Sequence, residues 1–361
     1  MKAIILPNDP LIAYVKKGEL KKRYFNPNNI FDEIIFVTFT DEEADSKDVQ
    51  FIVGNAKVTL FTFKPLTYKD IFSKKKLNEV LEALRNVQAD VVRAYNPTLT
   101  GYFAVKIAQD KKIPSIVSIH NVFQEIRSYI YYKKDILRAI KYWLLYPKEY
   151  YVYKHTTQII GVSAACFSSI PKRYLSKTKV LFNKVYKEDF YPQNLQKEYD
   201  IIMVGRLEKP KRQDILLQVL KEFDMKILLI GDGAEAQSLQ EYAQKNNLDV
   251  TFIHAVKNGD LIHYYNKANL NIQLTDYEGF GIPLLEAMAC GLDVMCSDIT
   301  PFREFAQDVP IYIKSKEELI QQLRHYNYHG VNTKALERFY AIEGTLLEKK
   351  EASLYHEVCD G

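Results

Sequence analysis

The sequence predicts an α/β protein made of two domains, each built on a parallel β-sheet. The chain has 361 residues, enough for two domains of ordinary size, and 47% of them are hydrophobic against 26% charged. Short apolar runs alternate with longer amphipathic stretches along both halves, as in repeated strand–helix–strand units. A stretch poor in apolar residues, 183–197, separates the two series and is the expected linker.

The predicted strands fall into two groups of similar size. In the first half they lie at residues 3–6, 34–37, 58–63, 91–95, 115–119, 158–162 and 179–182. In the second half they lie at residues 201–204, 226–230, 250–253, 270–274, 293–296 and 311–313. The apolar spacing of helices occurs at residues 76–86, 213–223 and 234–246.

These groups predict the domain organisation. Residues 1–190 are expected to form the first domain and residues 191–335 the second, and residues 336–361 are expected to form a helical segment that returns to the first domain. Open parallel sheets bind their ligands beyond the carboxyl ends of the strands. A cleft between the two domains is therefore the expected site.

Composition excludes several classes of protein. No apolar run approaches the roughly 18 residues that a membrane-spanning helix needs. The apolar stretch at residues 3–6 ends at Pro7, which indicates a strand rather than a signal peptide. The four cysteines form no CxxC pair, which argues against structural zinc and favours a reducing, cytoplasmic location. No Walker A loop, HExxH, GxSxG or DxD-like metal motif stands in a plausible context, and we expect no nucleic acid partner.

The two halves differ in charge. Residues 1–195 hold 31 Lys and Arg against 19 Asp and Glu, a balance of +12, and the remainder has a balance of −8. A basic half is typical of a protein that meets an anionic membrane or a phosphate-bearing acceptor. The alternative is that the excess lysines are scattered over a solvated surface.

Glycine is concentrated in one part of the second half. Seven of the chain's 14 glycines lie between Gly205 and Gly291, which indicates close backbone approach or a positive φ. Within this interval Pro283 suits the first turn of a helix and Gly291 suits its end. The amides before that helix would form an anion site, and they belong to Phe280, Gly281 and Ile282.

Two carboxylates flank this predicted anion site. Glu278 precedes the helix and Glu286 lies in its early turns. A diphosphate could bind the amides while each carboxylate accepts hydrogen bonds from sugar hydroxyls. Taken singly, Glu286 could instead complement the helix dipole and Glu278 could lie in solvent. The string as a whole favours a binding site.

Two more loops of the second half follow predicted strands. After residues 201–204, Gly205 begins a loop that suits diphosphate binding, unless its charges form a solvated surface. This loop holds four cations within seven residues, Arg206, Lys209, Lys211 and Arg212. After residues 226–230, Gly231 and Gly233 belong to a G-x-G-x-x-A pattern that is only weakly specific for dinucleotides. We interpret this pattern as a tight turn into a helix, near a phosphate or ribose.

His120 ends the predicted strand at residues 115–119 in the basic half. A histidine at the carboxyl edge of a strand could hydrogen-bond a sugar or stabilise charge. A lone histidine is more often structural, so position alone leaves both roles open.

Residues 127–154 hold seven basic residues, two acidic ones and nine aromatics, including the chain's single tryptophan. On a helical wheel one face collects the apolar residues Ile136, Leu137, Ile140, Trp143 and Leu144, and the opposite face collects Lys134, Arg138 and Lys141. This is the pattern of a helix at a membrane interface. It is equally the pattern of a surface helix with its apolar face in the core, which is the better interpretation from this segment alone. The +12 balance of this half nevertheless leads us to expect peripheral contact with an anionic membrane.

Together the motifs of the second half closely resemble those of the family-4 retaining glycosyltransferases. That family has a GRL…K string, a GDG turn, an EGFGIPxLEAMAxG block and a Ser-Asp followed by a Glu. This chain has them at residues 205–211, 231–233, 278–291 and 297–304. The Glu-x7-Glu spacing is specific, whereas the glycine turn alone is not. The first half is similar more loosely, through His120, Ser163 and Asn183.

The resemblance implies a GT-B fold, in which two Rossmann-like domains face each other across a central cleft. It implies a metal-independent hexosyltransferase that needs no cofactor and retains the anomeric configuration. The donor would be a UDP- or GDP-sugar, held by the second domain. The acceptor would be a glycan or lipid-linked molecule, held by the first domain, in cell-surface polysaccharide or glycoconjugate synthesis.

The resemblance also assigns roles to residues. Arg206 and Lys211 would hold the diphosphate and stabilise the leaving group, Glu278 would contact the donor sugar, and His120 would lie near the reaction centre. Glu286 would bind the ribose. The remaining donor-binding residues would be Gly205, Gly231, Gly233, Val256, Phe280, Gly281 and Ile282.

The chain departs from the family on the acceptor side. The glycine-rich N-terminal loop of many members is reduced to Lys16-Lys17-Gly18-Glu19, and Lys184 replaces the usual glycine after Asn183. Three alternatives remain open. They are a sugar-nucleotide epimerase or phosphorylase on the same fold, a non-catalytic partner subunit, and a dinucleotide oxidoreductase that rests on the glycine turn alone.

Overall fold

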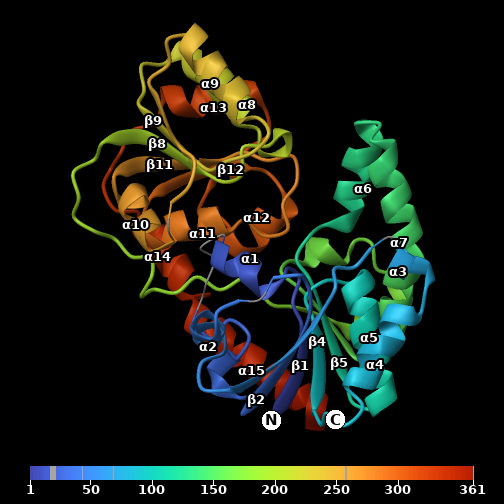
Figure 1. The fold of residues 1–361 in the computed structure, drawn as a ribbon. Helices are drawn as coiled ribbons and strands as arrows, with labels where there is room; N and C mark the ends of the chain where they lie inside the picture. Colours follow the sequence, from blue (N-terminus) through green and yellow to red (C-terminus); the bar gives the residue numbers. More distant parts are fainter. Residues whose placement is uncertain (17–21, 43, 68, 257, 361) are drawn as a thin grey trace. The chain divides into compact units, whose positions relative to one another are not determined.

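The structure is a computed structural model that describes residues 1–16, 22–42, 44–67, 69–256 and 258–360. The chain divides into two compact units, one formed by Met1–Leu181 with Glu348–Gly361 and the other by Phe182–Leu347. The last residues of the chain therefore belong to the same unit as the first (Figure 1). Lys17, Gly18 and Glu19 of the reduced N-terminal loop lie outside the described residues.

The first unit is built on a sheet of parallel strands in the order β3-β2-β1-β4-β5-β6-β7. The strands are β1 (Lys2–Leu6), β2 (Glu33–Phe39), β3 (Lys57–Phe63), β4 (Val91–Ala94), β5 (Ser115–Ile119), β6 (Gln158–Gly161) and β7 (Thr178–Val180). The central strands are runs of Ile and Val that are buried on both faces. Such runs form parallel sheets because helices cover both faces of the sheet.

Helices cover the two faces of this sheet (Figure 1). On one face Val80 of α4 (Lys75–Ala83), Phe103 of α5 (Leu99–Lys111) and Val152 of α7 (Ile136–His155) share a core with the strands. On the other face the ring of Tyr355, in α15 (Gly344–Asp360), packs edge-on against Phe31 at 4.9 Å between centroids. The remaining helices of the unit are α1 (Leu11–Lys16), α2 (Ser46–Val53), α3 (Lys69–Phe72) and α6 (Phe123–Tyr132).

The second unit is built on a sheet of parallel strands in the order β10-β9-β8-β11-β12-β13. The strands are β8 (Tyr199–Val204), β9 (Ile227–Ile230), β10 (Val250–Ile253), β11 (Ala268–Gln273), β12 (Asp293–Ser297) and β13 (Ile311–Ile313). One face is covered by α8 (Gln213–Val219), α9 (Ala236–Lys245) and α13 (Lys316–Arg324), and the other by α10 (Asn258–Asn266), α11 (Ile282–Ala289), α12 (Thr300–Ala306) and α14 (Thr333–Tyr340) (Figure 1).

The expected linker, residues 183–197, has no helix or strand, but it is not a free connector. It belongs to the second unit, where the buried side chain of Asn266 holds it. The Asn266 amide group donates to the carbonyl of Tyr191 at 3.1 Å and accepts from the amide of Gln193 at 2.6 Å. Lys197 donates to the carbonyl of Asn266 at 3.0 Å.

The structure confirms the predicted α/β class. Each predicted strand is found, and its ends differ from the prediction by at most two residues, which is within the ambiguity of strand and helix ends. The predicted helices correspond to α4, to α8 with the short turn Leu220–Glu222, and to α9. The predictions succeed because β-branched runs and helical spacing agree with the tertiary structure at each of these places.

Candidate active site

The order of the second sheet places β8 beside β11, with two strands beyond each of them. The loops that follow these two strands therefore leave in opposite directions, and their divergence makes an opening at the carboxyl ends of the strands. Arg206 and Lys211 lie on the loop after β8, and Glu278 lies on the loop after β11. The structure thus brings three of the four predicted catalytic residues to the reversal point of one sheet.

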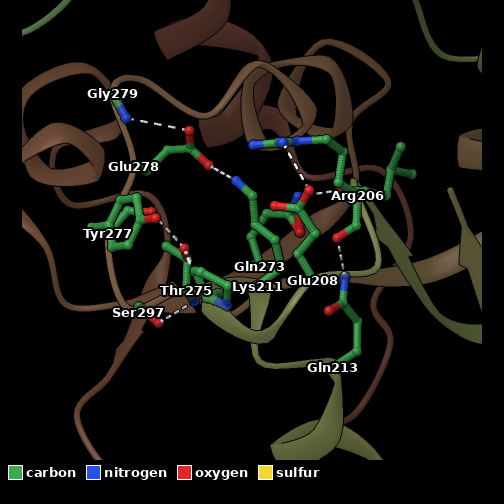
Figure 2. A network of polar contacts seen from close by, with 12 residues as sticks. Arg206, Glu208, Lys211, Gln213, Gln273, Thr275, Tyr277, Glu278, Gly279 and Ser297 are labelled. Atoms are coloured by element: carbon green, nitrogen blue, oxygen red, sulfur yellow. Dashed lines mark hydrogen bonds and ion pairs between the residues drawn. The ribbon is translucent and has the colours of Figure 1, made fainter. Parts of the chain in front are cut away.

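Hydrogen bonds hold these two loops together. The amide of Asp276 donates to the carbonyl of Pro210 at 2.8 Å. The hydroxyl oxygen of Thr275 lies 3.0 Å from the Pro210 carbonyl and 2.7 Å from the Tyr277 carbonyl (Figure 2). Arg212, whose backbone is left-handed with a φ of 54°, pairs with the Asp276 carboxylate at 2.7 Å. The loop after β8 is therefore fastened to the loop after β11 at several points.

Lys211 and Glu278 meet across the two loops. The ammonium of Lys211 is ion-paired with Oε2 of Glu278, and both side chains are about one-fifth to one-quarter exposed. The other carboxylate oxygen of Glu278 accepts from the amide of Gly279 at 3.2 Å (Figure 2). The interpretation of Glu278 as a solvated loop residue is therefore wrong, because its carboxylate is held by a cation and by an amide.

Arg206 is positioned differently. Its guanidinium is 72% exposed and pairs with Glu208 at 2.9 Å. Its backbone is held, because the buried side chain of Gln213 donates to the Arg206 carbonyl at 3.0 Å. Arg206 thus combines a fixed backbone with an exposed cation at the surface of the site (Figure 2).

Gly231 and Gly233 allow two loops to pack backbone against backbone. A Cβ atom on Gly231 would lie 2.0 Å from the carbonyl oxygen of Gly205, and one on Gly233 would lie 2.3 Å from that of Leu207. The amide of Glu235 also donates to the Leu207 carbonyl at 2.9 Å. Close approach to the loop after β8 therefore explains both glycines. A Cβ atom on Gly205 would meet no atom within 4 Å, so its side of the loop is open.

Helix α11 begins where the sequence predicts, with Pro283 in its first turn and Gly281 as its N-cap at a φ of 102°. A Cβ atom on Gly281 would lie 2.2 Å from the ring of Phe302, so a side chain has no room there. Within the described part of the chain, the amides of Phe280, Gly281 and Ile282 donate no hydrogen bond. These amides follow Glu278 on the same loop and suit an anion.

Glu286 lies inside the unit and not at its surface. Its side chain is 8% exposed, and its Oε2 accepts a hydrogen bond from the Tyr265 hydroxyl at 3.0 Å. Burial, followed by the Glu286 charge, raises the pKa of Tyr265 well above its ordinary value. The first turn of α11 holds no acidic residue, so Glu286 does not act mainly on the helix dipole. The sequence carries no signal for Tyr265.

Val256 follows β10, the edge strand of the sheet, and is half-buried. One strand, β9, lies between β10 and β8. Val256 is thus at the carboxyl edge of the sheet, but farther along it than Arg206, Lys211 and Glu278.

A cavity of about 580 Å³ in the second unit does not coincide with the predicted site. It lies at the carboxyl ends of β11, β12 and β13, and its lining includes Arg212, Asp276 and Asp298. Lys211, Glu278 and Glu286 do not line it. We place the candidate site at Lys211 and Glu278, because this ion pair is followed on the same loop by amides that donate no hydrogen bond within the described residues.

His120 lies in the other unit, directly after β5. Its ring stacks on Tyr95, with centroids 5.9 Å apart and planes 18° apart. Its Nε2 atom is buried and has no hydrogen-bond partner within the described residues. Burial, and then the nearby charge of Arg93, lower the pKa of His120 to about 4. His120 is therefore a neutral imidazole near pH 7, suited to hydrogen bonding rather than to donating a proton.

Arg93, the buried cation beside His120, is a residue that the sequence motifs do not identify. It lies in β4 at 2% exposure, donates to the Ser118 hydroxyl at 2.9 Å and pairs with Glu351 of α15 at 3.0 Å. Its guanidinium lies over the ring of Tyr95 at 4.9 Å. An arginine inside the apolar run of β4 was the available signal, since a buried charge needs partners.

The first unit also contains a cavity of about 310 Å³ that no sequence motif indicates. Asn8 after β1 and Asn96 after β4 line it, and these two strands are adjacent at the point where the strand order reverses. Lys141 and Leu145 of α7 complete one side. The cavity thus occupies the place in the first sheet that the Lys211–Glu278 pair occupies in the second.

Comparison with protein families matches both halves of the chain. The model described as "Glycosyltransferase Family 4" matches residues 32–183, and the one described as "Glycosyl transferases group 1" matches residues 186–324. O-antigen chain mannosyltransferase RfbU of Salmonella typhimurium is 32% identical over 46% of this chain and 49% of its own length. Alpha-monoglucosyldiacylglycerol synthase of Streptococcus pneumoniae is 24% identical over 73% of this chain and 63% of its own length. The chain thus spans about half to two thirds of these relatives.

Solved structures share the fold over nearly the whole chain. Sucrose-phosphate synthase from Thermosynechococcus elongatus has a TM-score of 0.75 and 16% identity, covering 99% of both chains. HepE from Anabaena, solved in complex with UDP and glucose, has a TM-score of 0.71 and 14% identity, covering 98% of this chain and 99% of its own. At such identities the likeness shows the fold, which is GT-B. With two family models that together span most of its length, the chain belongs to the family-4 glycosyltransferases.

Proposed function

We propose that this protein transfers a sugar from a nucleoside-diphosphate sugar to a glycan or lipid-linked acceptor. The observation that carries the proposal is the Lys211–Glu278 ion pair at the reversal point of the second sheet, followed on the same loop by the amides of Phe280, Gly281 and Ile282, which donate no hydrogen bond among the described residues. A donor diphosphate is an anion of the kind that such amides and cations bind. A sugar hydroxyl is a suitable donor to the Glu278 carboxylate.

Each group of the site has a role in this proposal. Arg206 and Lys211 bind the diphosphate, and Glu286 accepts hydrogen bonds from the ribose while Tyr265 fixes the orientation of its carboxylate. Glu278 orients the donor sugar, and its pairing with Lys211 keeps both side chains directed toward the same place. His120, in the first unit, contributes a neutral imidazole near the transferred sugar.

Leaving-group stabilisation is the central chemical requirement. The bond between the anomeric carbon and the diphosphate oxygen breaks, and the bonding electrons leave with the nucleoside diphosphate. Preorganised cations and amides stabilise this developing negative charge. We propose that Arg206, Lys211 and the amides suffice without a metal or other cofactor, and that the new bond keeps the configuration of the donor.

The names of relatives support the acceptor class. RfbU is an O-antigen chain mannosyltransferase, and the relative from Streptococcus pneumoniae is a synthase of a glucosylated diacylglycerol. A further relative, from Campylobacter jejuni, is 26% identical over 43% of this chain and acts on a diphospho-undecaprenol-linked sugar. We therefore propose a role in cell-surface polysaccharide or glycoconjugate synthesis.

A donor screen tests the proposal. The full chain is heated with individual UDP- and GDP-sugars, and one of them is expected to raise the melting temperature more than its free nucleoside diphosphate does. Hydrolysis or transfer of that donor is then measured with and without EDTA, with little change expected. Absence of stabilisation by any nucleotide-sugar would refute the donor class. A strict requirement for added Mg²⁺ or Mn²⁺ would refute the metal-free mechanism.

A further inference from the structure

Two helices of the first unit, α6 and α7, form a hairpin that extends away from the sheet (Figure 1). Its end exposes a group of large apolar and aromatic side chains, with Leu137 at 82% exposure and Trp143 at 75%. We call this group the hairpin tip and define it as Tyr131, Tyr132, Ile136, Leu137, Ile140 and Trp143. Contiguous exposed apolar surface of this kind marks an interaction site in a folded protein.

The two faces of α7 show that the tip is directed away from the core. Leu145 and Val152 are buried and lie seven residues, or about two turns, apart, so they mark the inward side. Arg138 lies seven residues before Leu145 and is on that same side. Ile136, Ile140 and Trp143 follow the helical spacing of the opposite side and are exposed. The interpretation that this apolar face packs into the core holds for Leu144, which packs against it, and is wrong for the exposed residues of the face, Ile136, Leu137, Ile140 and Trp143.

The hairpin is anchored at its base, so the tip is a presented surface and not a loose segment. Glu149 of α7 is fully buried, and its carboxylate is ion-paired with Arg127 of α6. The same carboxylate accepts from the Tyr153 hydroxyl at 2.6 Å. These contacts join α6 to α7 inside the unit.

The charge around the hairpin tip indicates what kind of partner it binds. Four exposed cations lie on the same part of the hairpin, Lys133, Lys134, Arg138 and Lys141, and the last two lie on the polar face of α7 opposite the apolar residues of the hairpin tip. Asp135 is the acidic residue among them and pairs with Arg138 at 3.9 Å. Tyrosine, tryptophan and basic side chains around an apolar stripe are typical of helices that lie in the headgroup region of a bilayer. In the described part of the chain, no helix is long and apolar enough to cross a membrane.

We propose that the hairpin tip docks the protein on an anionic lipid bilayer, with Leu137, Ile140 and Trp143 in the interface and the cations on lipid phosphates. The cavity of the first unit lies near the tip, because Lys141, two residues before Trp143 in α7, lines this cavity. Docking of the tip does not depend on the proposed function, but the identity of the acceptor does. If the protein is a glycosyltransferase, its acceptor is lipid-linked, and the polar head of the acceptor enters the cavity while its lipid chain stays in the bilayer.

Trp143 provides a direct test with the unmodified protein, because it is the only tryptophan of the chain. The full chain is mixed with vesicles of phosphatidylcholine and phosphatidylglycerol in equal parts, and separately with pure phosphatidylcholine. The proposal expects co-sedimentation with the first kind only, a blue shift of tryptophan emission, and reversal of both effects by high salt. Unchanged emission and no co-sedimentation with anionic vesicles would overturn it.

Two variants and two matched controls test the surface itself. Lys134→Glu/Arg138→Glu should lower the vesicle partition coefficient by about 25-fold or more, since each cation near anionic lipid contributes about fivefold. Lys349→Glu/Lys350→Glu makes the same charge change at exposed positions of α15 in the same unit and should have a much smaller effect. Leu137→Ser/Ile140→Ser should weaken binding by about tenfold or more. Its control is Phe51→Ser, at an exposed position of α2.

Other outcomes identify a different occupant. If the protein self-associates through the tip, the wild type will sediment as an oligomer without vesicles, Leu137→Ser/Ile140→Ser will be a monomer, and the bilayer proposal fails. Equal loss of vesicle binding in a variant and its control would overturn the assignment of the tip. Glu278→Gln should bind vesicles as the wild type does. Failure of the donor screen with intact vesicle binding would therefore refute the proposed function and leave the docking surface standing.

Discussion

Lys211 and Glu278 are ion-paired although they are 67 residues apart in the chain. Each follows a strand next to the point where the sheet reverses its order, so the fold converts a long separation into a contact. The pair sets opposite charges side by side, next to amides that donate no hydrogen bond in the described part of the chain. A diphosphate that binds Lys211 would share this cation with Glu278, which couples donor binding to the orientation of Glu278.

Arg206→Ala and Lys211→Ala are each expected to lower kcat by about a hundredfold while changing donor affinity much less. The reason is that charge on the leaving diphosphate is larger in the transition state than in the bound donor. The measurement is steady-state kinetics with the donor found in the thermal screen. Lys209→Ala is the control, because Lys209 is an exposed cation of the same loop. Equal effects at all three positions would mean that only the total charge of the loop matters.

Glu286→Gln is expected to weaken donor binding by about 1.5–3 kcal/mol, the usual contribution of hydrogen bonds to a charged group. Calorimetric titration with the nucleotide-sugar measures this change. Tyr265→Phe serves as the comparison, since it removes the hydroxyl that Glu286 accepts from and keeps the carboxylate. A purely structural Glu286 would make both variants lose stability alike while donor affinity stayed constant.

Gly231→Ala and Gly233→Ala are expected to lower the free energy of unfolding by about 1–3 kcal/mol, as overpacked substitutions do. The added Cβ atoms would collide with backbone oxygens, which have no alternative rotamer. Denaturation followed by circular dichroism measures the change. Gly259→Ala is the control, because its Cβ atom would meet no atom within 4 Å. Wild-type stability in Gly231→Ala would contradict the close packing of the two loops.

His120 is expected to make stability depend on pH. Its pKa is lowered from 6.5 to about 4 by burial and by Arg93, so between these values the unfolded chain binds more protons than the folded one. The contribution of His120 to stability is then constant above about pH 6.5 and is lost as the pH drops toward 4, by about 3 kcal/mol at most. His120→Gln should flatten this part of the profile, measured as the difference from wild type at each pH. His356→Gln, at an exposed position of α15, should leave the dependence in place.

Glu351→Ala is expected to lower the free energy of unfolding by about 3–5 kcal/mol, because it leaves Arg93 as an uncompensated charge in the core. Both side chains of this pair are at most 4% exposed. Glu357→Ala is the matched control on the same helix, since its pair with Lys179 is about half exposed. Exposed pairs contribute about 0–1 kcal/mol. The measurement is the melting temperature of each variant, which should fall much further for Glu351→Ala than for Glu357→Ala. Equal decreases would show that the Arg93–Glu351 pair is not the main anchor of α15.

The sequence by itself determined the α/β class, the strands and the loops that carry the site. Runs such as residues 201–204 are apolar and mostly β-branched, and Pro283 with Gly291 bounds a helix, so local chemistry and the final fold agree at these places. The motif around Glu278 is also contiguous in the sequence. It could be read without knowing its neighbours in space.

Only the tertiary structure decided which distant groups meet and which way each face turns. Strand order brings Lys211 to Glu278, loop packing explains Gly231, and α15 brings Glu351 to Arg93. Helical spacing shows that α7 has an apolar face, but the burial of Leu145 and Val152 on the other side shows that most of this face is turned outward. The physical reason is that periodicity records the difference between two faces of an element, whereas burial depends on what the rest of the chain packs against each face.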